Sequence, residues 1–123
     1  MEKFAAFARI AEIEFSDIVL SIQDLGNKLR IYLKDTSFID FFFTTKLKTQ
    51  RFSIHWERAH IKRGIFRLDN TPDKNWRKVE TFPLHFHRKT YENVGKPPFT
   101  TEKRNTLKTL FRAFLQFARE NIV

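Results

Sequence analysis

Three short segments of this sequence place histidine, arginine and aspartate side chains between apolar residues. The segments cover residues 51–57, 65–69 and 84–87 and read RFSIHWE, IFRLD and LHFH. Successive side chains of a β-strand point to opposite faces, so each segment is expected to have one apolar and one polar face. The side chains on the polar faces are our candidate catalytic residues: His55, Arg67, Asp69, His85 and His87.

Three imidazoles, one guanidinium and one carboxylate on a common face suffice in principle to cleave RNA without a metal ion. The reaction needs a base for the 2′-hydroxyl proton, an acid for the leaving oxygen and a cation for the charged transition state. Histidine serves both proton roles, because its ordinary pKa of about 6.5 keeps both of its forms populated near neutral pH. We therefore predict no metal and no cofactor for this mechanism.

Two other interpretations of the same residues stay open. Histidines on a solvated sheet face are often bystanders, and Arg67 with Asp69 is then an ordinary surface ion pair worth under about 1 kcal/mol. Alternatively, His85 and His87 bind a metal ion together with His55 and Asp69, because side chains two residues apart on a strand can face one ion. A zinc or manganese titration that shows no binding above background would exclude the metal-binding interpretation.

The positive charge of the sequence is concentrated in its second half. The chain has 123 residues and a net charge of +9. Residues 1–60 contain nine lysines and arginines against eight acidic residues, whereas residues 61–123 contain fourteen against six. Cationic side chains near phosphates release condensed counterions, so this excess favours RNA or another polyanion as a partner.

The two tryptophans receive different predictions. Trp56 lies on the apolar face of its segment and is expected to pack in the core. Trp76 lies in a basic run, where two interpretations stay open: it stacks on an unpaired base, or it packs under its own loop. The residues predicted to contact nucleic acid are Lys74, Trp76, Arg77, Lys78, Arg88, Lys89, Lys108 and Arg112.

Several classes of protein are disfavoured by what the sequence lacks. The sequence has no cysteine, which excludes disulfides, thiolate catalysis and cysteine-ligated zinc. It has no apolar run of the roughly 18 residues that a membrane span needs, and no signal-peptide pattern. We therefore expect a cytoplasmic protein that begins at Met1 and makes no contact with a membrane.

The segments between and around the polar faces predict a single α+β domain over residues 1–123. Residues 1–13 and 107–122 have apolar side chains at helical spacing. Turn-forming residues at 25–28 and 34–37 separate strand-like segments between the two helices. We expect an N-terminal helix, an antiparallel meander of five to six strands and a C-terminal amphipathic helix packed on the sheet.

Finer expectations concern individual segments. Three consecutive phenylalanines at 41–43 predict a β-bulge or a buried edge, and residues 93–98 are expected to be a linker. Thr100 or Thr101 is expected to cap the C-terminal helix. One flank of that helix is expected to be basic, through Lys108, Arg112 and Arg119.

The motif FRLDNTP at residues 66–72 is followed by TFPLHFH at residues 81–87. With these two motifs, the region from about residue 50 to residue 88 resembles the TumE family, the toxin components of small prokaryotic toxin–antitoxin pairs. The resemblance implies a toxin that a small cognate antitoxin neutralises, and it supplies no reaction. Members often carry histidine where this chain has Asp73 and Leu84. The motif positions are Arg67, Asp69, Asn70, Pro72, Pro83, His85 and His87, and His55 falls on the preceding strand.

These observations lead to one hypothesis and two alternatives. We predict a toxin that acts on RNA, through metal-independent cleavage by the five candidate catalytic residues or by occlusion. The first alternative is a non-enzymatic module that binds nucleic acid or a protein and is neutralised by its antitoxin. The second is a domain whose basic surface meets only an acidic antitoxin. Self-association through an exposed strand edge stays open as well.

Overall fold

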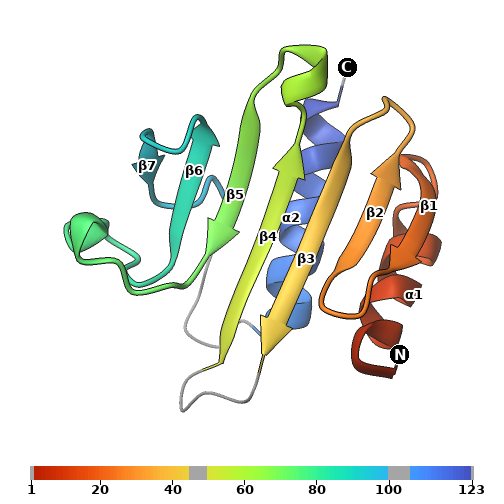
Figure 1. The fold of residues 1–123 in the computed structure, drawn as a ribbon, viewed down its shortest axis with the longest axis horizontal. Helices are drawn as coiled ribbons and strands as arrows, with labels where there is room; N and C mark the ends of the chain where they lie inside the picture. Colours follow the sequence, from red (N-terminus) through yellow and green to blue (C-terminus); the bar gives the residue numbers. More distant parts are fainter. Residues whose placement is uncertain (1, 45–49, 100–105, 123) are drawn as a thin grey trace.

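The computed structural model describes residues 2–44, 50–99 and 106–122, which form one antiparallel sheet and two α-helices (Figure 1). The seven strands lie side by side in chain order, so the sheet is a meander. The predicted α+β class is confirmed, with seven strands in place of five to six. The strands are β1 Val19–Asp24, β2 Leu29–Leu33, β3 Phe38–Thr44, β4 Arg51–Glu57, β5 Ile65–Asp69, β6 His85–Lys89 and β7 Val94–Gly95.

Both helices cover the same face of the sheet (Figure 1). Helix α1, Ala5–Glu14, follows a 3-10 turn at Glu2–Phe4 and confirms the predicted N-terminal helix. Helix α2, Leu107–Asn121, confirms the C-terminal one. Two further 3-10 turns, η2 Ala59–Ile61 and η3 Lys74–Trp76, interrupt the loops around β5.

Thr106 caps α2 at its N-terminus. The Thr106 side chain accepts a hydrogen bond from the backbone nitrogen of Thr109 at 3.2 Å, which satisfies one of the amides that have no partner in the first helical turn. The caps that we predicted, Thr100 and Thr101, lie outside the described residues.

The core is a layer of phenylalanine and aliphatic side chains between the sheet and the helices. Phe41, Ile54, Leu68 and Phe86 are paired across β3, β4, β5 and β6, and each is at most 1% exposed. Phe111 of α2 packs against this row, with its ring centroid 4.9 Å from that of Phe41. Burial of each such side chain stabilises the fold by about 1.5–3 kcal/mol, so this layer fixes the strands that carry the polar faces.

The predicted bulge at residues 41–43 is wrong. β3 pairs with β4 in regular register from Phe38 to Thr44. Successive side chains of β3 therefore alternate between the two faces of the sheet. Phe42 lies on the face away from the helices, where it is 36% exposed. The irregular register lies instead in β1, between Val19 and Ser21.

The predicted linker at 93–98 contains a strand. Val94 and Gly95 form β7, which pairs with His87 and Phe86 at the edge of the sheet. Its two residues are too short for an alternating pattern, so the sequence offered no period to detect.

The basic flank of α2 faces carboxylates of the N-terminal region. Arg112 Nε lies 2.9 Å from Glu14 Oε1, and Arg119 Nη2 lies 2.8 Å from Asp17 Oδ1. These pairs tie α2 to the end of α1 and neutralise two of the three cations in the predicted flank. In the described part of the chain, neither helix is long and apolar enough to cross a membrane.

Candidate active site

Two polar rows cross β4, β5 and β6 on the face opposite the helices. In one row His55 pairs with Arg67, and Arg67 with His87. In the other row Asp69 pairs with His85. Adjacent strands lie about 4.8 Å apart, so these side chains are neighbours. The structure therefore brings all five predicted catalytic residues together.

Asp69 is the centre of this cluster. Its Oδ1 lies 3.0 Å from His85 Nε2, and its Oδ2 lies 3.0 Å from Arg67 Nε and 3.7 Å from His87 Nε2. The Thr71 backbone nitrogen donates to Oδ1 at 3.0 Å. Burial alone would raise the pKa of this carboxyl, but the hydrogen bonds from His85 and His87 outweigh it and hold the pKa of Asp69 well below its usual range.

Backbone carbonyls fix the orientation of both C-terminal histidines. His85 Nδ1 lies 2.9 Å from the Pro83 oxygen, and His87 Nδ1 lies 2.9 Å from the Tyr91 oxygen. A carbonyl only accepts hydrogen bonds, so both Nδ1 atoms carry a proton and both Nε2 atoms face Asp69. Burial lowers the pKa of His85, but Asp69 and the Pro83 carbonyl outweigh it, and the pKa is raised above its ordinary value.

His55 has the opposite protonation preference. Its Nε2 lies 3.1 Å from Glu57 Oε1, and its Nδ1 lies 3.5 Å from Arg67 Nη1. Arginine only donates, so Nδ1 is the acceptor and Nε2 carries the proton of a neutral ring. Burial lowers the pKa of His55, and the charge of Arg67 adds to this, although Glu57 acts against both.

One continuous polar chain results, running from Glu57 through His55, Arg67 and Asp69 to the two C-terminal histidines. The chain opens at a cleft of about 240 Å³, which we call the polar cleft. Lys28 stands in this cleft, paired with Asp40 at 3.0 Å. The residues that line the polar cleft are Lys28, Asp40, Phe42, Ser53, His55, Arg67 and Tyr91.

The histidines are more deeply buried than an exposed sheet face would leave them. His85, His87 and His55 are 2%, 7% and 9% exposed. Their surface is covered by aromatic rings from loops: the Tyr91 ring stacks on His55 at 6.1 Å, and the Trp76 ring lies 6.4 Å from that of His85. The polar face is therefore not open to solvent at the histidines, because two loops fold over it.

Sequence reasoning missed two members of the site. Glu57 could have been found, because it lies two residues after His55 on the same face of the same strand. Tyr91 could not, because it lies in the connection to the unpredicted strand β7.

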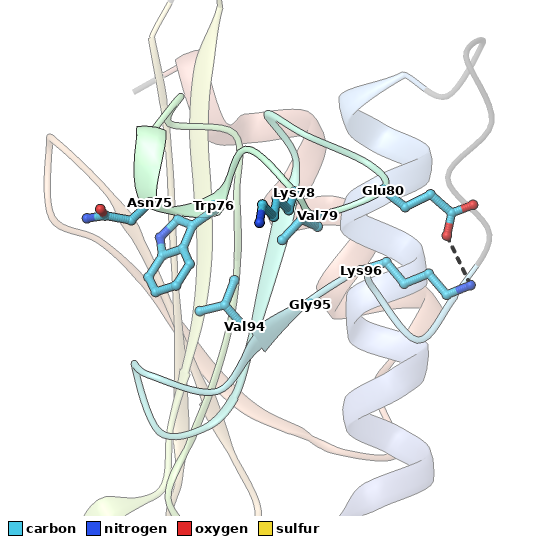
Figure 2. A pocket seen from close by; sticks show the side chains of 8 residues that line it. All are labelled: Asn75, Trp76, Lys78, Val79, Glu80, Val94, Gly95 and Lys96. Atoms are coloured by element: carbon cyan, nitrogen blue, oxygen red, sulfur yellow. Dashed lines mark ion pairs between the residues drawn. The ribbon is translucent and has the colours of Figure 1, made fainter.

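Trp76 separates the histidines from a second, open pocket of about 430 Å³ (Figure 2). Its ring centroid lies 6.2 Å from that of His87. Val94 and Gly95 of β7 form another part of the wall, and the ion pair between Glu80 and Lys96, at 3.4 Å, closes the far end (Figure 2). Trp76 thus contacts the catalytic candidates on one side and lines an accessible pocket on the other.

The predicted nucleic-acid contacts fall into separate groups. Lys74, Arg77 and Lys78 are exposed around Trp76 and have no ion pair among the described residues. Arg88 and Lys89 are exposed at the end of β6. Lys108 and Arg112 lie instead on α2, across the sheet from the polar cleft, so the structure does not bring them to the same surface.

Asp69, His85 and His87 also have the donor set of a metal site. Their ligand atoms lie within 4.8 Å of one another, and metal-binding histidines commonly donate the other ring N–H to a carbonyl, as these two do. His55, which we had added to the metal alternative, is instead engaged with Glu57. Arg67 at 3.0 Å from Asp69 competes with a cation for the carboxylate.

Comparison with known proteins gives one finding. A family model described as Toxin TumE matches residues 4–122, nearly the whole chain. No curated protein and no solved structure matches.

Proposed function

This chain belongs to the TumE family of toxins, and on that premise we propose that it acts on RNA, cleaving the strand by acid–base catalysis in the polar cleft. A small cognate antitoxin would be its partner, as the family implies. The observation that carries the proposal is the convergence of His55, His85, His87, Arg67 and Asp69 on one sheet face, where the pKa of His55 is lowered and that of His85 is raised.

His55 is the base in this mechanism. The substrate would displace the long 3.5 Å contact between Arg67 Nη1 and His55 Nδ1, so that the neutral Nδ1 accepts the proton of the 2′-hydroxyl. Glu57 holds Nε2–H and orients the ring, the arrangement by which a third group positions a catalytic base. The 2′-oxygen then bonds to phosphorus and the bond to O5′ breaks. The lowered pKa of His55 supports this role, because a base must be unprotonated at working pH.

The acid comes from the histidine pair that shares Asp69. The raised pKa of His85 favours its protonated form, and its Nε2–H would pass to the leaving O5′ once the substrate displaces the contact with Asp69. Arg67, between His55 and Asp69, supplies positive charge for the pentavalent transition state. Trp76 with Lys74, Arg77 and Lys78 would hold the strand beside the cleft by stacking and phosphate contacts.

The test compares the wild type with His55→Gln and with the double variant His85→Asn/His87→Asn. Asparagine keeps a side-chain donor for the Pro83 and Tyr91 carbonyls, and His60→Asn is the matched control, because His60 lies outside the cluster and bonds to the Thr36 oxygen. Thermal unfolding verifies that each variant folds.

Purified wild type with excess single-stranded RNA and EDTA is expected to give several product molecules per protein, ending in 2′,3′-cyclic phosphate. Removal of an acid or base should slow this about 10²–10⁴-fold, and His60→Asn should not. Expression of the wild type and of His60→Asn should arrest cell growth, whereas expression of the acid and base variants should not. Equal RNA cleavage and equal toxicity in all variants would end the catalytic proposal.

A binding function without turnover is the second candidate. It is favoured by the 2% exposure of His85 and by the anchoring of both C-terminal histidines to the backbone, which suit a structural role. A binder would protect RNA stoichiometrically and release no products. Cleavage that EDTA abolishes and Mn²⁺ or Zn²⁺ restores would instead favour a metal at Asp69, His85 and His87.

A further inference from the structure

The turn between β4 and β5 forms a pocket whose charged lining is entirely cationic. The pocket has a volume of about 330 Å³ and lies where β4 and β6 end. No carboxylate lines it. Its lining residues are Arg58, Lys62, Arg63, Gly64 and Lys89.

Arg58 is a buried cation without a carboxylate partner in the described part of the chain. It is 5% exposed, its Nη2 donates to the Arg63 carbonyl oxygen at 2.6 Å, and its Nε has no hydrogen-bond partner. The guanidinium lies 4.4 Å from the Trp56 ring centre and 4.7 Å from that of Phe66. Buried charges in proteins are normally paired, so the Arg58 guanidinium favours an anion that enters this pocket.

The backbone holds the cations together in spite of their mutual repulsion. Arg58 N donates to the Gly64 oxygen, and Arg63 N to the Arg58 oxygen, both at 3.1 Å. Gly64 has φ +75° and packs against Lys89 so closely that a Cβ would lie 2.6 Å from the Lys89 oxygen. The turn is thus fixed against the end of β6, which makes the cluster preorganised.

Asp35, whose charge acts on Arg58, and Glu57, which precedes Arg58 in the chain, are both engaged with other groups. Asp35 hydrogen-bonds to the Ser37 backbone nitrogen at 2.9 Å and to its hydroxyl. Glu57 hydrogen-bonds to His55 and to the Ala59 backbone nitrogen. Lys62, Arg63 and Lys89 have no ion pair among the described residues.

We propose that this pocket, formed by Arg58, Lys62, Arg63, Gly64 and Lys89, binds a phosphate group, namely a backbone phosphate of the RNA strand whose neighbouring segment lies in the polar cleft. This assignment of the RNA source rests on the proposed function. Lys89 lies two residues beyond His87 on β6, about 7 Å along the strand, so an RNA chain that leaves the cleft along β6 reaches the pocket next. Phosphate binding would supply the anion that buried Arg58 lacks.

The first arm measures binding of a single-stranded RNA 10-mer at several salt concentrations. Lys62→Gln/Arg63→Gln is expected to weaken binding about tenfold or more and to lower the salt dependence by about one released ion per lost contact. The control, Arg9→Gln/Lys34→Gln, makes the same charge change at exposed positions of α1 and the β2–β3 turn and should stay within about twofold. Equal losses in both double variants would overturn the assignment of RNA to this pocket.

The second arm titrates inorganic pyrophosphate and follows backbone amide NMR signals. Shifts centred on residues 58–64, present in the wild type and lost in Lys62→Gln/Arg63→Gln, support the phosphate pocket even if RNA does not bind. Absence of such shifts overturns it. If the wild type binds RNA but shows no pyrophosphate shifts, the proposed function stands and the phosphate pocket is refuted. If the wild type shows the pyrophosphate shifts but does not bind RNA, the pocket stands and RNA is refuted as the origin of its phosphate.

Discussion

At the scale of single residues, the site shifts the pKa values of two chemically identical side chains in opposite directions. His55 is buried beside Arg67, and its pKa is lowered, whereas His85 donates toward Asp69, and its pKa is raised. Pairs of titratable groups whose environments push their pKa values apart mark acid and base assignments. The difference arises from neighbours on adjacent strands, so it depends on register more than on local sequence.

This separation predicts the order of histidine titrations. In wild-type protein, His85 should titrate above and His55 below the ordinary value of 6.5. Asp69→Asn should bring the His85 pKa down, because the partner that raises it is gone, and should leave His55 titrating below 6.5. Histidine ring NMR signals followed against pH measure this, and a His85 pKa at or below that of His55 would contradict it.

The ion pair between Asp69 and His85 predicts a pH-dependent contribution to the free energy of unfolding. The lowered pKa of Asp69 stabilises the fold above its ordinary value of 3.8, and this contribution is lost as the pH falls through the folded pKa. The raised pKa of His85 stabilises the fold below 6.5, and that contribution is lost as the pH rises through the folded pKa. Asp69→Asn should therefore lower the free energy of unfolding most, by about 3 kcal/mol, between pH 3.8 and pH 6.5, and less below and above this range. Urea unfolding from pH 3 to 9 tests this, and a pH-independent cost would refute it.

At the scale of elements, the turns between strands fix the positions of the strands that they connect. The β4–β5 turn approaches β6 through Gly64, where both φ and space require glycine, whereas an added Cβ at Gly95 of β7 would meet no atom within 4 Å. The two glycines therefore form a natural comparison.

Gly64→Ala should destabilise the protein by about 1–3 kcal/mol, because alanine is strained at positive φ and its Cβ would clash with Lys89. Gly95→Ala should change the free energy of unfolding by less than about 0.5 kcal/mol. Urea titration of both variants measures the difference, and similar costs at both positions would show that the close approach is unimportant.

The periodic spacing of apolar residues made most helices and strands predictable from the sequence. Contacts between residues that are far apart in the sequence were not predictable. Phe52, Ile54 and Trp56 alternate with polar residues and correctly predicted β4 with its core face. The shared polar face followed from that period. The burial of its histidines did not, because Tyr91 and Trp76 cover them from loops whose paths no local pattern specifies. Likewise, Arg112 looked available in the sequence, and only the docking of α1 places Glu14 against it.

At the scale of the whole molecule, the cations on the flank of α2 and those around Trp76 differ in their partners. On the helical side Arg112 and Arg119 are paired with carboxylates, whereas Lys74, Arg77 and Lys78 beside the histidines have no ion pair in the described ranges. An exposed cation that is already paired has less to gain from a phosphate. Lys74, Arg77 and Lys78 are therefore more available to a phosphate than Arg112 and Arg119 are.

This distribution predicts which cations govern RNA affinity. Lys74→Gln/Arg77→Gln/Lys78→Gln should weaken binding of single-stranded RNA at least tenfold and flatten its salt dependence. Arg112→Gln, where the cation already pairs with Glu14, should change affinity by about twofold or less. Fluorescence anisotropy with a labelled oligonucleotide at 50–200 mM salt provides the measurement, and a larger loss for Arg112→Gln would place the binding surface on the helices.

The two outer strands of the sheet have a consequence for how the protein behaves at high concentration. β1 is interrupted by the irregular pairing between Val19 and Ser21, and β7 offers only two residues. Long, flat borders of a sheet act as templates on which further copies add without limit, and both of these borders are poor templates. We therefore expect this chain, in spite of its fifteen phenylalanines, to resist fibre growth from β1 and β7.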